Sequence, residues 1–160
     1  MDYTTLTESE LLQTHASVID ELLRRGVVRT RNNPIGDYTE WLVCDRLSLE
    51  LQPNSMMSYD GIDSNGIRYQ IKGRRAESKT APVQLSVIRN LEKSGFDFLI
   101  AVIYNSDYTI RFAAKIPHAV LPEISAYRRH VNGHVALIRD TVLNYPGVTD
   151  ITAQLHRHSA

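Results

Sequence analysis

The longest apolar run of the chain, residues 98–104, sets the strongest limit on its fold. It is much shorter than the roughly 20 residues that a membrane-spanning helix needs, and it is rich in residues that favour strands. A strand that is apolar at every position must be covered on both faces, because alternate side chains point to opposite sides. We therefore expect residues 96–104 to form the central strand of a sheet with protein on both sides.

Local signals divide the rest of the chain into helices and strands. Thr7 and Glu10 have the spacing of a capping box, which predicts a first helix ending at Gly26. Asp37 is the expected N-cap of a second helix that continues to about Leu47. The remaining expected elements are strands over 59–63 and 67–73, a helix over 83–93, a strand over 108–116 antiparallel to the central one, a helix over about 117–130, a strand over 134–138 and a terminal helical segment after 147.

Composition and length fit one domain of the α/β (α+β) class, a mixed sheet flanked by helices. The chain has 160 residues, of which 42% are hydrophobic. We expect a single domain over 1–160, with a core at about 36–116, an N-terminal helix and turn over 1–35, and a C-terminal extension over 117–160. Cys44 has no partner for a disulfide, and the N-terminus lacks the features of a signal peptide. We expect a cytoplasmic protein with no membrane segment.

Positive charge is concentrated in two patches, although 18 Lys and Arg residues balance 18 Asp and Glu residues overall. The first patch holds four arginines over residues 24–31, and pairing with nearby carboxylates explains it as well as ligand binding does. The second patch follows the strand over 67–73 and is opposed locally only by Glu77. Its members are candidate phosphate contacts for a nucleic acid: Arg68, Arg74, Arg75 and Lys79. Gln84, Ser86 and Arg89, on the expected next helix, are weaker candidates.

The expected hairpin over 59–73 brings an acid, an amide and an amine together. Gln70 and Lys72 share one face of the second strand because they are two residues apart. If the turn has three residues, Asp63 faces Ile67 and Asp60 lies across from Gln70, with β-carbons about 5 Å apart. With a two-residue turn, Asp63 joins the face of Gln70 but lies further from Lys72. We favour Asp60, because only its register lets one ion touch both strands.

These residue types suit phosphoryl chemistry with a hard cation. Mg²⁺ prefers oxygen ligands, which Asp60 and the carbonyl oxygen of Gln70 supply. The ammonium group of Lys72 can hold an attacking water and balance the charge that builds on phosphorus. Glu40 supplies a second acid if its helix packs at the mouth of the hairpin; alternatively, Glu40 only completes a capping box with Asp37. An ordinary surface ion pair is the alternative for the hairpin itself.

Residues 36–42, 59–61 and 69–74 together resemble the PD-(D/E)XK nuclease superfamily, the restriction-endonuclease-like fold. Within it, the chain resembles a group of small bacterial proteins. The resemblance implies an αβββαβ core from Asp37 to Tyr104, with Glu40 as the helix acid. It also implies a central metal ligand at Asp60, a second ligand position at Gln70 and a catalytic lysine at Lys72.

Two positions depart from the usual motif. Tyr59 replaces the proline before the aspartate, and Gln70 replaces the usual second acid. A glutamine form of the motif occurs in Mrr-like restriction enzymes. The resemblance thus implies a Mg²⁺-dependent DNA endonuclease, with Mn²⁺ as a substitute ion and a homodimer as a plausible assembly for cutting both strands. A catalytically inactive nuclease fold that binds DNA or a protein partner is the alternative, in which Gln70 marks a degraded site.

Overall fold

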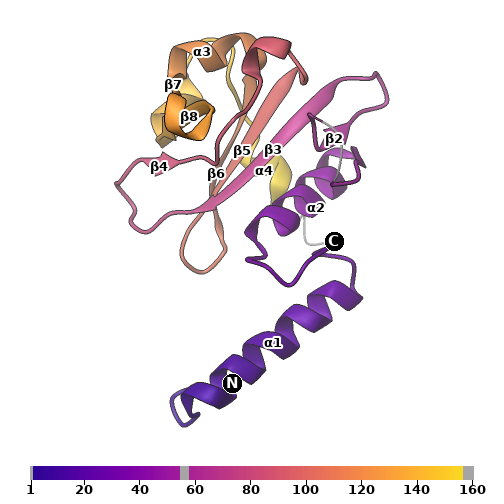
Figure 1. Ribbon diagram of the computed structural model, residues 1–160, viewed down its shortest axis with the longest axis vertical. Coiled ribbons are helices and arrows are strands. Elements are labelled where there is room, and N and C mark those ends of the chain that lie inside the picture. The colour runs from indigo at the N-terminus through magenta and orange to yellow at the C-terminus, as the bar shows by residue number, and fades with distance from the viewer. Residues whose placement is uncertain (1, 55–57, 157–160) are drawn as a thin grey trace.

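A computed structural model describes residues 2–54 and 58–156 (Figure 1). Its elements belong to the α+β class that we expected, with a mixed central sheet and a second, smaller sheet. None of the helices in the described ranges is both long enough and apolar enough to cross a membrane. The helices are α1 (Glu8–Arg24), α2 (Ile35–Leu47), α3 (Leu121–Ile124) and α4 (Thr152–Leu155), with short 3-10 turns at Leu91–Lys93, His118–Val120, Arg129–Val131 and Asp140–Asn144.

The central sheet has six strands in the order β1-β2-β3-β5-β6-β9. Strands β3 and β5 pair in parallel, and the other neighbours pair antiparallel. The small sheet has the order β4-β8-β7 and is antiparallel throughout. The strands are β1 (Glu50–Leu51), β2 (Gly61–Ile62), β3 (Arg68–Arg75), β4 (Val83–Gln84), β5 (Phe98–Tyr104), β6 (Ile110–Pro117), β7 (Ser125–Arg128), β8 (Gly133–Ile138) and β9 (Thr149–Asp150).

Strand β5 is the buried centre of the structure, as its sequence predicts. Residues 99–104 all have no solvent exposure. Alternate side chains enter two separate cores: Leu99 and Ile103 pack with the small sheet and α3, whereas Ile100 and Tyr104 pack with α2 and α4. Helices therefore cover one face of the central sheet, while the small sheet and α3 cover the other.

The first helix begins as expected, and the second does not. Thr7 and Glu10 form both hydrogen bonds of the capping box at the start of α1. Helix α2 begins at Ile35, after Pro34, so the prediction of Asp37 as its N-cap was wrong. The carboxylate of Asp37 instead accepts hydrogen bonds from the backbone amides of Arg29 and Thr30, which fastens the incoming loop to the helix.

Two expected helices do not form as predicted. Residues 83–93 form β4 and a 3-10 turn rather than a helix, so the αβββαβ order lacks its second helix in the described chain. Val83 and Leu85 are buried while Gln84 and Ser86 are exposed, and this period of two matches the pairing of β4 with β8. Residues 117–130 contain only short helical turns followed by β7, which also pairs with β8. In both segments, long-range strand pairing overrides the weak local helical pattern.

Candidate active site

Helix α2 lies directly on strand β3 because Gly73 has no side chain. A β-carbon at Gly73 would overlap the Thr39 hydroxyl and lie 2.8 Å from the Thr39 β-carbon. Thr39 is fully buried, and its hydroxyl oxygen lies 3.1 Å from the hydroxyl of Tyr104 on β5. This close contact fixes the height of α2 above the sheet. It also fixes Glu40, the next residue, near the hairpin of β2 and β3.

The hairpin has the register that places Asp60, rather than Asp63, beside β3. Gly61 pairs with Tyr69, and the Asp63 amide donates to the Ile67 carbonyl at 3.0 Å, as a three-residue turn requires. The Asp63 carboxylate is used inside the turn, where it accepts from the amides of Asn65 and Ile67. The three-residue turn that we favoured from the sequence is confirmed, whereas the expected pair of Asp60 with Gln70 is not part of the ladder between β2 and β3.

Asp60 is held against the backbone of β3. Its amide donates to the carbonyl of Tyr69, which already faces Gly61, so two consecutive residues oppose one as in a β-bulge. Its Oδ2 accepts a hydrogen bond of 2.7 Å from the amide of Ile71, the residue between Gln70 and Lys72. Burial raises the pKa of Asp60, although the Ile71 hydrogen bond and the charge of Lys72 oppose that change. The carboxylate is therefore rigid and partly desolvated.

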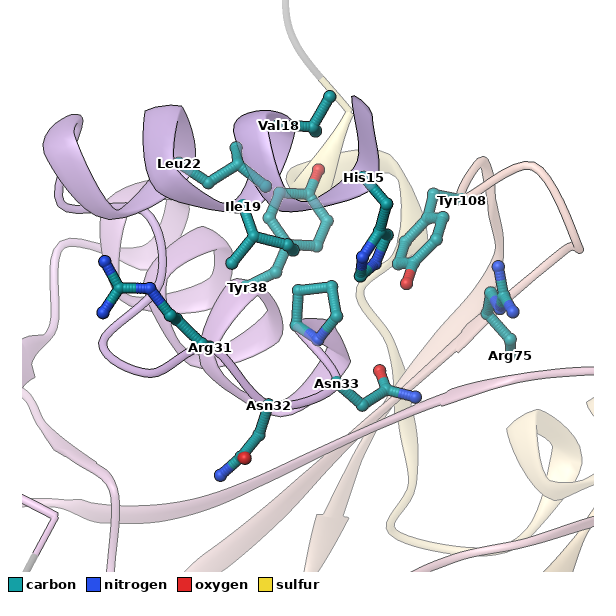
Figure 2. Close-up of a pocket in the computed structure, with 11 residues that line it drawn as sticks. His15, Val18, Ile19, Leu22, Arg31, Asn32, Asn33, Tyr38, Arg75 and Tyr108 are labelled. Atoms are coloured by element: carbon teal, nitrogen blue, oxygen red, sulfur yellow. The ribbon is translucent and has the colours of Figure 1, made fainter. Parts of the chain in front are cut away.

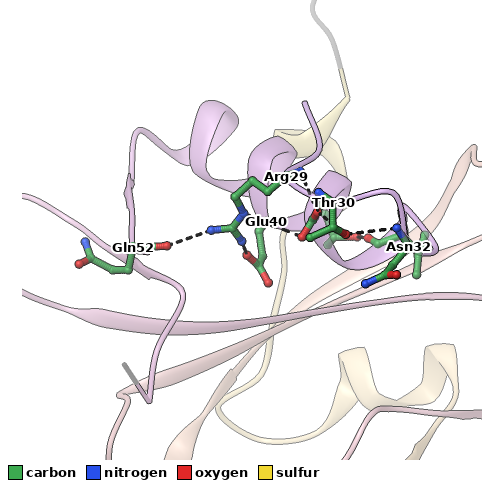
Figure 3. A network of polar contacts seen from close by, with 8 residues as sticks. Arg29, Thr30, Asn32, Glu40 and Gln52 are labelled. Carbon is green, nitrogen blue, oxygen red and sulfur yellow. Dashed lines mark hydrogen bonds and ion pairs between the residues drawn. The ribbon is translucent and has the colours of Figure 1, made fainter. Parts of the chain in front are cut away.

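Glu40 is paired with Arg29, which the sequence gave no role beyond the first basic patch. The Arg29 guanidinium forms an ion pair with Glu40 and also donates to the carbonyl of Gln52 at 3.1 Å (Figure 3). Burial and the charge of Asp60 nevertheless raise the pKa of Glu40 to about 7, because they outweigh the attraction of Arg29. The acidic residue Glu40 thus changes protonation near neutral pH.

The other three arginines of the first patch form local ion pairs. Arg24 and Arg25 both bind Glu21, and Arg31 binds Asp20. The structure therefore shows these arginines pairing with nearby carboxylates, which was the alternative to ligand binding.

Lys72 and Gln70 point away from the apolar face that packs on α2. The Lys72 ammonium donates to the hydroxyl of Ser86 at 3.1 Å, just after β4. Burial lowers the pKa of Lys72, while the charges of Asp60 and Glu40 oppose that change, so the three groups lie within electrostatic reach of one another. The Oε1 atom of Gln70 is buried and accepts no hydrogen bond from any part of the described chain.

The candidate phosphate contacts have different surroundings. Arg68 forms two side-chain hydrogen bonds with Asp97 and is already engaged. Arg75 lies over the ring of Tyr108, 4.9 Å from its centroid. Arg74 and Lys79 are exposed, and Arg74 follows Gln70 and Lys72 on the same face of β3. Arg68 and Arg74 therefore flank Gln70 and Lys72 on the same face of β3, and Arg68 is held there by its ion pair with Asp97.

The candidate ligand atoms of this site are mixed in type. Within residues 2–54 and 58–156, no group of three or more His, Cys, Asp or Glu residues is arranged to hold a metal. Asp60 and Glu40 are the two acids, and Gln70 contributes a neutral oxygen. An unpartnered buried oxygen is costly, and carboxylate and amide oxygens are the donors that a hard divalent ion prefers, so the residue types fit such an ion.

Comparison with known proteins gives no family assignment. No protein-family model matches the chain, and no curated protein matches it either.

Proposed function

We propose that this protein is a divalent-metal-dependent nuclease that hydrolyses phosphodiester bonds in DNA. The observation that carries the proposal is the buried, unpartnered Oε1 of Gln70, next in sequence to the Ile71 amide that fixes Asp60. A strand that buries an acceptor beside a desolvated carboxylate and a desolvated lysine loses stability unless a ligand compensates. Such perturbed groups gather at functional sites more often than elsewhere.

In this proposal Asp60, Gln70 and Glu40 hold Mg²⁺, and Mn²⁺ can replace it. When bound, the ion polarises the scissile phosphate and lowers the pKa of a bound water. Lys72 positions the attacking water and offsets negative charge on the phosphate oxygens. Ser86 holds the Lys72 ammonium in place. Glu40 would hold the ion in place of its contact with Arg29, and its deprotonated form above a pKa of about 7 is the form that could do so.

The resemblance to the PD-(D/E)XK superfamily supports this assignment residue by residue. Glu40 is on a helix over the sheet, Asp60 at the end of a hairpin strand, and Lys72 on the next strand. We assign contacts with the DNA backbone to Arg74, Arg75 and Lys79. Arg68 would contact DNA only after leaving its ion pair with Asp97. The buried, unpaired thiol of Cys44 is compatible with our inference of a cytoplasmic location.

Cleavage of plasmid DNA in the presence of Mg²⁺ or Mn²⁺ tests the proposal. We expect Lys72→Ala to lose at least about 100-fold in rate, because the water and the phosphate both lose their cationic partner. Lys93→Ala, which removes an exposed lysine, is the control and should cleave normally. Gln70→Glu should retain or increase activity, since an added carboxylate strengthens a metal site. Undiminished cleavage by Lys72→Ala, or complete loss in Gln70→Glu, contradicts the proposed roles.

A second function, DNA binding without cleavage, is favoured by one observation: Arg29 already neutralises Glu40. This function predicts salt-dependent DNA binding that ignores Mg²⁺ and survives Asp60→Ala. A protein-binding regulator, in which Asp60 and Lys72 are only structural, would bind neither DNA nor metal. Titration with Mn²⁺ and with a DNA duplex distinguishes these outcomes.

A further inference from the structure

Helix α1 leaves much of its apolar surface uncovered. It extends away from the two sheets (Figure 1), and Ile19 is its buried residue. Leu11, Leu12 and Val18 are 40%, 71% and 51% exposed. A soluble helix normally buries such side chains, and Leu11 and Val18, seven residues apart, lie on one face, so their exposure indicates an absent partner.

The uncovered surface borders a groove between α1 and the rest of the chain. The groove has a volume of about 710 Å³, and His15 and Ile19 face Tyr38 and Tyr108 across it (Figure 2). Val18 also lines the groove while half of its surface remains exposed. The exposed apolar side chains of α1 and the groove are therefore one continuous apolar surface.

Four residues of α1 form a stripe along one face, and the intervals between them read the same from either end of the helix. Leu11, His15, Val18 and Leu22 are separated by four, three and four residues, the alternation that lines one side of a packed helix. When a second copy of the helix lies antiparallel, Leu11 of each copy meets Leu22 of the other, and His15 meets Val18. A two-fold interface needs this property, since a contact from one residue to another must also occur in reverse.

The charges of α1 fit the same antiparallel arrangement. The first turn carries Glu8 and Glu10, while Arg24 and Arg25 at the other end share the single carboxylate of Glu21. The antiparallel pairing places Glu8 of one copy opposite Arg25 of the other. Opposed helix dipoles also favour this direction.

We propose that α1 is a dimerisation helix, which pairs antiparallel with α1 of a second copy along the stripe Leu11, His15, Val18 and Leu22. The paired helix lies along the edge of the groove and covers its apolar opening. A helix of 17 residues is about 25 Å long, so the helix pair alone gives a small interface, and the wall formed by Tyr38 and Tyr108 extends it. This inference is independent of the proposed nuclease activity.

Sedimentation equilibrium over a concentration series tests the interface with the whole chain. Wild type should reach a dimer and never a higher oligomer, because the two-fold pairing closes. Leu11→Glu with Val18→Glu should raise the dimer dissociation constant at least about 100-fold, since four charges enter the apolar seam of the dimer. Gln13→Glu with Ser17→Glu adds the same charge to the opposite side of α1 and should leave the dissociation constant unchanged.

Charge exchange tests the direction and register of the pairing. Glu8→Arg alone or Arg25→Glu alone should weaken the dimer by about tenfold, because each places like charges together twice. The double exchange Glu8→Arg with Arg25→Glu should restore wild-type affinity. Circular dichroism of each variant, with unchanged helix content, excludes unfolding as the cause.

Three results would overturn the proposal. A wild-type chain that stays monomeric at every concentration leaves the stripe for another partner, and co-sedimentation with anionic lipid vesicles would then identify a membrane surface. A dimer that tolerates Leu11→Glu with Val18→Glu uses a different surface. Failure of the double exchange to restore affinity excludes the antiparallel register.

Discussion

Glu40→Gln should make the protein more stable at pH 8 and leave it nearly unchanged at pH 5. The side chain of Glu40 is only 17% exposed, and burial with the charge of Asp60 raises its pKa from 4.5 to about 7. Between these values the folded protein binds more protons at Glu40 than the unfolded chain does. The free energy of unfolding therefore falls as the pH rises through this window.

The size of the effect follows from the pKa change. Moving the pKa of Glu40 from 4.5 to about 7 costs the folded state roughly 3 kcal/mol once the pH exceeds 7. Glutamine has the same shape and no charge, so it removes this cost. This cost already includes the attraction of Arg29, which lowers the pKa that burial and Asp60 would otherwise give. We expect a net stabilisation of about 1–3 kcal/mol at pH 8.

Urea unfolding at pH 5, 6, 7 and 8 in a chelating buffer measures this difference. Glu50→Gln, which removes a carboxylate from an exposed position on β1, is the matched control. In a parallel series without chelator, Mn²⁺ should stabilise wild type at pH 8 and stabilise Glu40→Gln less, because binding to the folded state adds to its stability. A stability difference between Glu40→Gln and wild type that does not change with pH would refute the assigned burial and pKa of Glu40.

Two further substitutions, each compared with a second variant, test the packing of α2 on β3 and the contacts with DNA. Gly73→Ala should destabilise the protein by about 1–3 kcal/mol in urea, because its β-carbon overlaps Thr39 and lifts α2 from the sheet. Gly36→Ala in the same helix meets no atom within 4 Å and should be neutral or stabilising, so equal destabilisation by both would contradict this reasoning. Arg74→Ala should weaken DNA binding and lower its salt dependence, as seen by fluorescence anisotropy, whereas Arg68→Ala should mainly reduce thermal stability. The opposite order of effects would show that Arg68 leaves its ion pair for DNA.

Several features of the site were predictable from local sequence. The sequence left two hairpin registers open, and we favoured the three-residue turn, which the structure has, with the Asp63 carboxylate accepting from two amides. The spacing of Gln70 and Lys72 then fixed their common face on β3. The capping box at Thr7 likewise predicted the start of α1, and the continuous apolar run predicted the burial of β5.

Arg29 and Ser86 could not be recognised as neighbours of the site. Each contacts its partner across a long stretch of chain: Arg29 reaches Glu40 through the loop before α2, and Ser86 reaches Lys72 because β4 folds onto the small sheet. The segment of β4 has a weak helical pattern, so its strand pairing was missed. Asp97 lies in an otherwise apolar segment, so the sequence did not indicate its ion pair with Arg68.

The sequence alone determined those features that depend on neighbours within a few residues: the first helix cap, the common face of Gln70 and Lys72 and the double-sided burial of β5. The tertiary structure decided which distant segments pair, and with them the second sheet, the height of α2 over Gly73 and the ion pair of Glu40. The physical reason is that strand pairing and burial depend on partners anywhere in the chain, whereas caps and turns are satisfied by adjacent backbone groups.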